Sequence, residues 1–97
     1  MFRKMGLPSR SESLPFVYIL RCRDGSFYTG AAKNLLARVR KHEAGTASRY
    51  TRARLPVALV WSRRVRTWGK ALREEHRIKQ LKRRAKEALV ASGGSRA

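Results

Sequence analysis

The feature that most constrains the fold is a pair of short apolar segments separated by a strong turn signal. Residues 16–22 (FVYILRC) are rich in β-branched and aromatic side chains, which are typical of a strand. The pattern resumes in residues 26–30 (SFYTG) after Asp24 and Gly25. An Asp-Gly pair between two such segments is typical of a β-hairpin. The sequence therefore predicts two antiparallel strands joined by a tight turn.

The length of this turn decides on which face two tyrosines lie. A two-residue loop at Asp24 and Gly25 would pair residue 22 with residue 27 and place Tyr18 and Tyr28 on opposite faces. A three-residue loop over 23–25, with Gly25 at positive φ, would pair residue 22 with residue 26 and place both tyrosines on one face. The sequence permits either loop.

Two helices are predicted after the hairpin, each with a recognisable start. Asn34 can cap a helix over about 35–44. Thr67 can cap a second helix over about 68–91, with a break near residues 83–84. Each helix has apolar side chains at helical spacing, so each is expected to pack one face against the sheet.

A third strand is predicted over residues 57–62, after a polar and basic loop over 46–56. The order β-β-α-β-α(-α) predicts an α/β (α+β) fold, in which a small three-stranded antiparallel sheet is flanked by helices. We expect a single domain over residues 14–91, a flexible basic tail over 1–13 and a flexible tail over 92–97.

The charge of the chain indicates its class of partner. There are 24 Lys and Arg against 6 Asp and Glu, a formal charge of +18. Such an excess repels itself in a compact fold, so it calls for a partner that neutralises it. Nucleic acid fits better than an acidic protein or a membrane surface, because bound phosphates release counterions and no stretch approaches ~18 apolar residues. Cys22 is the single cysteine, which excludes an intrachain disulfide and fits a reducing cytoplasm.

A carboxylate falls on the inward side of the second predicted helix. The apolar stripe of this helix consists of Ala71, Ile78, Ala85 and Leu89. Glu75 falls inside the stripe and Glu74 near its edge. A carboxylate there needs a partner, either a cation such as Arg73, Lys79 or Arg38 or a bound Mg²⁺ or Mn²⁺ ion. Mg²⁺ often binds through one or two carboxylates plus waters and phosphate. Periodicity alone does not choose between the two glutamates.

The first predicted helix carries two further polar residues of interest. Arg38 and His42 are four residues apart, so they meet on one face, with His42 along the apolar stripe. Taken alone, they are typical of a surface charge and a core histidine. Zinc is disfavoured, because Cys22, His42 and His76 lack the close ligand spacing of a zinc site.

Basic side chains surround an aromatic one in the predicted loop, a combination that suits phosphates and stacked bases. The expected nucleic-acid contacts in the loop are Arg49, Tyr50, Arg52 and Arg54. We expect Lys33 and Lys79 to contribute as well.

Together these segments resemble the GIY-YIG nuclease superfamily, in particular its small single-domain bacterial members. The resemblance covers about Phe16 to Val90. Residues 17–19 (VYI) take the place of the first family motif and residues 28–30 (YTG) that of the second. The family then has an Arg four residues before a His or Tyr, and Arg38 and His42 take these places.

The second helix adds the metal-binding part of the resemblance. Residues 71–79 (ALREEHRIK) are similar to the family pattern A-L-x-x-E-x-x-I-K, and this match selects Glu75 as the metal ligand. The chain also departs from the family: Val17 replaces a Gly, Thr29 replaces the usual Ile, and residues 31–32 are Ala-Ala where a Thr is frequent.

The resemblance implies a metal-dependent endonuclease that hydrolyses phosphodiester bonds, with DNA rather than RNA as the expected substrate. The implied catalytic residues are Tyr18, Tyr28, Arg38, His42 and Glu75. Glu75 would hold one Mg²⁺ or Mn²⁺ ion, Arg38 would stabilise developing charge, and one of the two tyrosines would orient or deprotonate the attacking water.

Two further expectations follow from this resemblance. Gly30 would let the backbone come close to the nucleic acid. Both tyrosines can serve one site only if they share a face, which predicts the three-residue loop with Gly25 at positive φ. The alternative is a non-catalytic basic module on the same fold that binds DNA or RNA.

Overall fold

A computed structural model gives the fold and describes residues 14–93. Three strands form one antiparallel sheet in the order β3-β2-β4, so β2 is the central strand. The strands are β2 (Phe16–Arg21), β3 (Phe27–Ala32) and β4 (Ala58–Arg64). The helices are α1 (Leu35–Glu43), α2 (Arg49–Arg52), α3 (Trp68–Lys79) and α4 (Arg83–Ala91). The predicted three-stranded fold and its element order are confirmed.

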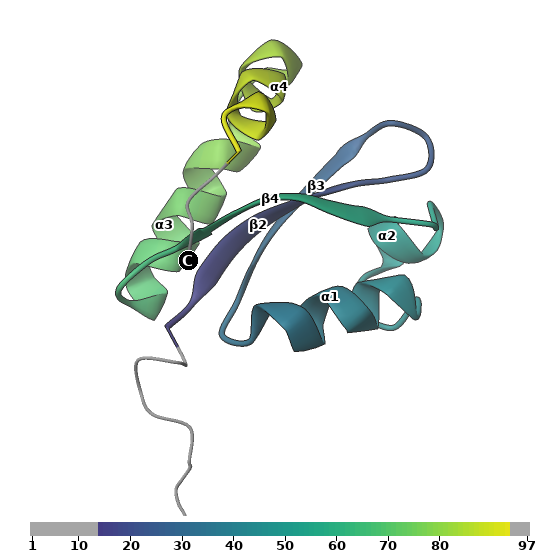
Figure 1. The fold of residues 1–97 in the computed structure, drawn as a ribbon, viewed down its shortest axis with the longest axis horizontal. Coiled ribbons are helices and arrows are strands. Elements are labelled where there is room, and N and C mark those ends of the chain that lie inside the picture. Colours follow the sequence, from purple (N-terminus) through teal and green to yellow (C-terminus); the bar gives the residue numbers. More distant parts are fainter. Residues whose placement is uncertain (1–13, 94–97) are drawn as a thin grey trace, which may run out of the picture.

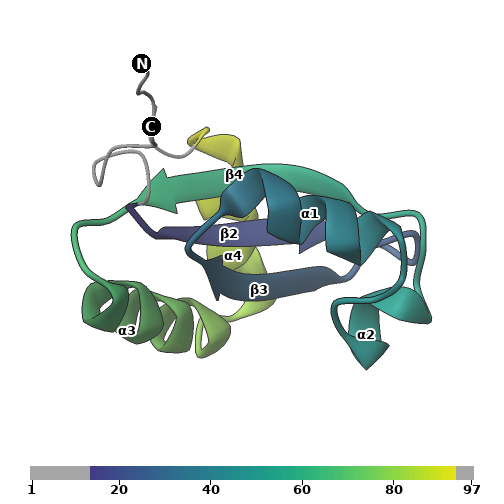
Figure 2. The ribbon, with the colours of Figure 1, turned by 90° about the horizontal axis from the view of Figure 1, so that it is seen from below.

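Helices cover both faces of this sheet. α1 and α2 lie on one side of the strands and α3 and α4 on the other (Figure 1). Seen from below, α1 lies in front of the sheet, α4 behind it, and α3 beside the edge strand β3 (Figure 2). Alternation along β2 divides the core into two clusters. The cluster on the α1 side comprises Tyr18, Leu20, Cys22, Ala32, Val39 and Val57. The cluster on the other side comprises Val17, Ile19, Trp61, Ala71 and Ile78.

The hairpin has the three-residue loop. Gly25 has a φ of +85°, and the backbone N–H of Cys22 donates to the carbonyl of Ser26 at 2.8 Å. The resulting register pairs Tyr18 with Gly30 and Leu20 with Tyr28. Because paired residues point to the same side of a sheet, both tyrosines project from the face that α1 covers. The prediction of a three-residue loop is therefore confirmed.

The helix starts lie where the sequence placed them. The Asn34 side chain accepts a hydrogen bond from the N–H of Ala37 at 3.0 Å, and the Thr67 hydroxyl accepts one from the N–H of Lys70 at 3.1 Å. Two details differ from the prediction. Residues 46–56 are not all loop, because they contain the single turn α2. Ala85 is exposed rather than buried, since the break after Lys79 resets which face of α4 meets the sheet.

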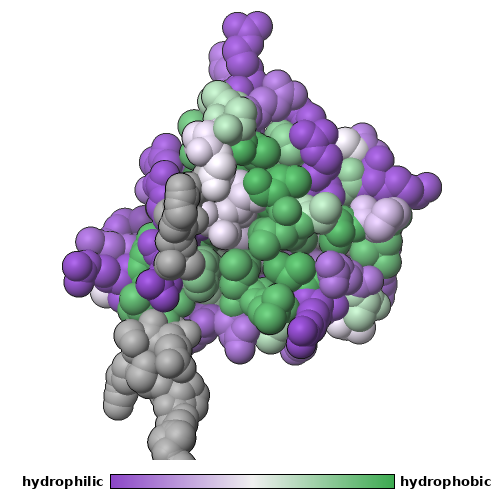
Figure 3. All heavy atoms as spheres, in the orientation of Figure 1, coloured by the Kyte–Doolittle hydropathy of each residue, from purple (hydrophilic) through white to green (hydrophobic). Residues whose placement is uncertain are grey.

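The surface combines charge with a limited apolar area. Apolar side chains gather in the middle of the face shown in Figure 3, between strongly hydrophilic margins. Within residues 14–93 no helix has the length and apolar character needed to cross a membrane. Cys22 is buried and free. The tail expected over 1–13 lies outside the described residues, as do residues 94–97 of the C-terminal tail.

Candidate active site

Tyr18 lies at the centre of the candidate site. It is buried in the α1-side cluster and leaves the central strand directly opposite Gly30. A Cβ placed on Gly30 would lie 2.5 Å from the Tyr18 hydroxyl oxygen and 2.6 Å from its Cζ. The ring therefore lies across Gly30, and its hydroxyl reaches over the edge strand β3. Gly30 was expected to contact nucleic acid, but it is buried and its lack of a side chain makes room for Tyr18.

A chain of buried polar groups holds the Tyr18 hydroxyl. The oxygen is 2.8 Å from Nε2 of His42, whose Nδ1 is 2.8 Å from the hydroxyl oxygen of Thr51. Thr51 in turn lies 2.9 Å from the hydroxyl oxygen of Ser48 and can also donate to the Ser48 carbonyl at 3.4 Å. His42 and Thr51 are both almost completely buried. His42 is thus a core histidine that uses both ring nitrogens.

This chain allows a proton arrangement in which Nε2 of His42 is an acceptor. With its proton directed at Ser48, the Thr51 oxygen accepts from the Nδ1–H of His42, which leaves the lone pair of Nε2 to accept the Tyr18 O–H. Burial, with a further contribution from the Arg38 charge, lowers the pKa of His42 below its ordinary value. Both effects favour the neutral form of His42, in which Nε2 can accept the Tyr18 hydrogen bond.

The charged residues approach Tyr18 from two different helices. The pKa of Tyr18 is raised, chiefly by burial and next by Tyr28; the Arg38 charge lowers it and the Glu75 charge raises it. Arg38 lies on α1 and Glu75 on α3, so both helices bring a charge within electrostatic range of the same hydroxyl. Tyr28 is half-buried, with its ring centroid 5.0 Å from that of His42 and 6.5 Å from that of Tyr18. Tyr18, Tyr28 and His42 thus lie together, and the charges of Arg38 and Glu75 act on the Tyr18 hydroxyl.

Glu75 is paired with a lysine on its own helix. Its carboxylate is 2.8 Å from Nζ of Lys79, and the side chains are 19% and 50% exposed, respectively. The other partners considered from sequence, Arg73 and Arg38, are not the ones that pair with it. Glu74 instead binds Arg77 at 2.7 Å. Because Lys79 is half exposed, it can leave Glu75 at little cost.

The acidic residues suit a magnesium-type site with few protein ligands. Among the described residues, no three His, Cys, Asp or Glu side chains group together as metal ligands. Glu75 offers one partly exposed carboxylate within electrostatic range of Tyr18. Mg²⁺ and Mn²⁺ accept such a site, because waters and substrate phosphate complete their coordination.

The basic residues of the predicted loop lie away from the N-terminal end of α1. Arg49, Tyr50 and Arg52 form α2, which follows the C-terminal end of α1 (Figure 2). The Tyr50 ring stacks on that of Tyr28, with 6.0 Å between the ring centroids. The Arg54 guanidinium lies 3.8 Å from the centroid of the Tyr50 ring, and its Nε is 3.1 Å from a carboxylate oxygen of Asp24. Tyr50 therefore serves contacts within the protein, and a base could stack on it only by displacing Arg54.

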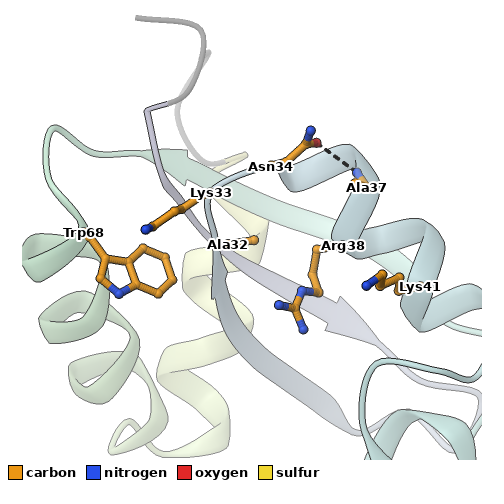
Figure 4. Close-up of a pocket in the computed structure, with 7 residues that line it drawn as sticks. All are labelled: Ala32, Lys33, Asn34, Ala37, Arg38, Lys41 and Trp68. Atoms are coloured by element: carbon orange, nitrogen blue, oxygen red, sulfur yellow. Dashed lines mark hydrogen bonds between the residues drawn. The ribbon is translucent and has the colours of Figure 1, made fainter. Parts of the chain in front are cut away.

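Sequence reasoning missed three residues of the site. Thr51 and Ser48 lay in a segment interpreted as loop, and the only local signal was Ser48, which caps α2 and so indicates a helical turn. Trp68 was treated only as the start of a helix. It lies instead in a pocket at the N-terminal end of α1, together with Lys33 and Arg38 (Figure 4).

Comparison with known proteins identifies the family of this chain. The sequence model of the family described as the GIY-YIG catalytic domain matches residues 14–88 of this chain. UPF0213 proteins of Staphylococcus aureus strains Mu3 and N315 are each 47% identical over 75 residues, which is 77% of this chain and 92% of each relative. The solution NMR structure of a UPF0213 protein from Bacillus halodurans is 42% identical with a TM-score of 0.55, covering 84% of this chain and 86% of that one. The chain belongs to the GIY-YIG family, among the small proteins named UPF0213.

Proposed function

We propose that this protein is a metal-dependent endonuclease that hydrolyses phosphodiester bonds in nucleic acid, with DNA as its main substrate in the bacterial cytoplasm. The observation that carries the proposal is the buried chain from Tyr18 through His42 to Thr51, with the charges of Arg38 and Glu75 both acting on the Tyr18 hydroxyl. A protein that only binds phosphates has no need of a buried proton-accepting chain. The charge of +18 supplies the affinity for the substrate backbone.

In the proposed mechanism Tyr18 is the group that handles the attacking water. An ordinary tyrosine is a weak base, and burial raises the pKa of Tyr18 further, so its proton needs an acceptor. The lone pair of His42 Nε2 is that acceptor: Tyr18 takes a proton from the water as its own proton passes to His42. This hydrogen bond favours Tyr18 over Tyr28 as the base.

The charged residues act on the phosphate. Arg38 provides a fixed positive charge that stabilises negative charge developing on the phosphate oxygens. Glu75 would hold a divalent Mg²⁺ or Mn²⁺ ion, which when bound stabilises charge on the scissile phosphate and the leaving oxygen. Lys79, released from Glu75, is free to bind a neighbouring phosphate.

A non-catalytic basic module is the second candidate. Two observations favour it: Glu75 is already paired with Lys79, and residues 31–32 lack the hydroxyl frequent in the family. In that case Glu75 is a structural acid. The two candidates differ in what the loss of the Glu75 charge should do.

The decisive experiment is the substitution Glu75→Gln, with Glu74→Gln as the matched control. Loss of an i,i+4 pair on a helix costs about 0.3–0.5 kcal/mol when a partner such as Lys79 is half exposed, so the melting temperature of the Glu75 variant should change little. Cleavage of plasmid DNA with Mg²⁺ or Mn²⁺ should fall by about two orders of magnitude or more, because metal stabilisation is worth several kcal/mol. Nucleic-acid affinity in EDTA should be retained, and the Glu74 variant should cleave like the wild type. Full cleavage by Glu75→Gln, or no metal-dependent cleavage by the wild type, would favour the non-catalytic module.

A further inference from the structure

A pocket of about 360 Å³ lies where α1, the end of β3 and the start of α3 meet. Figure 4 shows its walls: Arg38 and Lys41 extend from α1, Ala32 lies at the end of the strand, and the Trp68 ring stands on the opposite side. Lys33 points across the opening toward Trp68. A pocket of this size suits a small molecule or one residue of a polymer rather than a whole double helix.

Trp68 is placed differently from the other tryptophan. Trp61 is 2% exposed in the core, whereas Trp68 is 37% exposed at the first position of α3. Nζ of Lys33 lies 5.3 Å from the centroid of the Trp68 ring, within range of a cation–π contact. The ring stands at the wall of an open pocket, and a base can stack on it once the flexible, exposed Lys33 side chain moves aside.

The remaining lining is basic. Lys33, Arg38 and Lys41 are all exposed cations, and none of the described residues that line the pocket is acidic. An aromatic wall with three cations matches a ligand that joins a flat ring to a negative charge. A nucleotide has both, since any base can stack on an aromatic side chain and its phosphates bind Lys and Arg.

We propose that this pocket binds one unpaired nucleotide of the substrate strand, with its base stacked on Trp68 and its phosphates on Lys33 and Lys41. The inference rests on the proposed function, because Arg38 belongs both to the pocket and to the candidate active site, so the bound nucleotide lies next to the scissile phosphate. A base inside a duplex is covered by its neighbours in the stack. The pocket therefore selects single-stranded, flapped or frayed positions over intact duplex.

The test is binding without cleavage, in EDTA. The probes are labelled single strands of about ten nucleotides, oligothymidylate and oligouridylate, an abasic strand of the same length and a DNA duplex. Wild-type protein should bind at least one base-containing strand about tenfold or more tightly than the abasic strand, and that strand should change the Trp68 fluorescence. In Trp68→Ala the emission that remains comes from Trp61 and should not respond.

Variants separate the stacking role from folding and charge. Trp68→Ala should lose about tenfold or more in single-strand affinity while its duplex affinity changes less than about twofold. Trp68→Phe should retain most of the preference, since a ring remains. Leu72→Ala is the matched control, an exposed apolar residue one turn along α3, and should bind like the wild type.

The outcomes distinguish the two proposals. Suppose that the wild type binds both single strands and duplex, but Trp68→Ala lowers the two affinities equally or lowers neither. The pocket inference is then wrong while the nuclease proposal stands. If abasic and base-containing strands bind alike, the inference is wrong in the same way. If no nucleic acid binds even at low salt, the proposed function fails together with the inference.

Discussion

Gly30 gives a direct test of how the candidate site is built, because the Tyr18 ring occupies the space of its missing side chain. In Gly30→Ala the new Cβ would meet the Tyr18 hydroxyl oxygen at 2.5 Å and Cζ at 2.6 Å, whereas ordinary contacts begin near 3.4 Å. The ring therefore has to move by about 1 Å. It is buried among the α1-side core residues, so it cannot move without disturbing them or losing its hydrogen bond to His42.

The cost can be estimated from these contacts. Overpacking of a dense core costs about 1–3 kcal/mol, and the lost Tyr18–His42 hydrogen bond about 1 kcal/mol more. Alanine regains about 0.4–1 kcal/mol by restricting the unfolded chain. We expect a net loss of about 1–3 kcal/mol, which lowers the melting temperature of a domain of this size by roughly 5–20 °C. Cleavage should fall by about 100-fold, since a 1 Å displacement of a catalytic group has that effect.

Differential scanning calorimetry and a plasmid cleavage assay measure the two effects. Gly69→Ala is the matched control: its Cβ would meet nothing closer than 3.8 Å, and alanine favours the helix, so this variant should melt at or above the wild-type temperature. If Gly30→Ala melts like the wild type and leaves the Tyr18 ring resonances in NMR unchanged, the ring does not lie across Gly30 and the account of the site is wrong.

Two other predictions concern the buried chain. Thr51→Val removes the hydroxyl that His42 Nδ1 contacts, so it should lower the free energy of unfolding in urea by about 1–3 kcal/mol and also lower the cleavage rate. Thr51→Ser keeps the hydroxyl and should keep the cleavage rate. Equal cleavage rates in the two variants would exclude a role for the hydroxyl. The pKa of His42 is lower in the folded protein than in the unfolded chain, so the unfolded chain binds the proton more tightly. The free energy of unfolding should therefore fall as the pH drops below about 6.5, and it should level off once His42 is protonated in the folded protein as well. His42→Gln should lose this part of the pH dependence, and an unchanged profile would mean that His42 does not titrate in this way.

The elements with local signals could be predicted from sequence. The Asp24-Gly25 turn and the Asn34 and Thr67 caps each act within a few residues, and the structure has all of them. The family resemblance supplied the choice that periodicity left open, Glu75 over Glu74. The prediction that Ala85 belongs to the inward apolar stripe was wrong, because a short break between α3 and α4 changes which side chains face the sheet. No local pattern fixes the angle at which a helix restarts.

The parts that could not be predicted depend on distant segments. Thr51 is nine residues from His42 in sequence, and nothing in its own neighbourhood shows that its hydroxyl meets an imidazole. Tyr50 was expected to stack on bases because it is an aromatic residue among arginines. Its contacts with Tyr28 and Arg54 come from tertiary packing, which composition does not reveal.

The position of α3 explains how residues from both sides of the sheet can share one site. β3 is an edge strand, and α3 packs along it, which covers an edge otherwise open to pairing with another chain. The same placement brings Glu75 to the border where Tyr18, which starts on the opposite face, reaches across Gly30. A side chain that starts on the α1-covered face can approach α3 by crossing this edge strand. The absence of a side chain at Gly30 therefore lets the buried Tyr18–His42 pair reach the edge of the sheet beside α3.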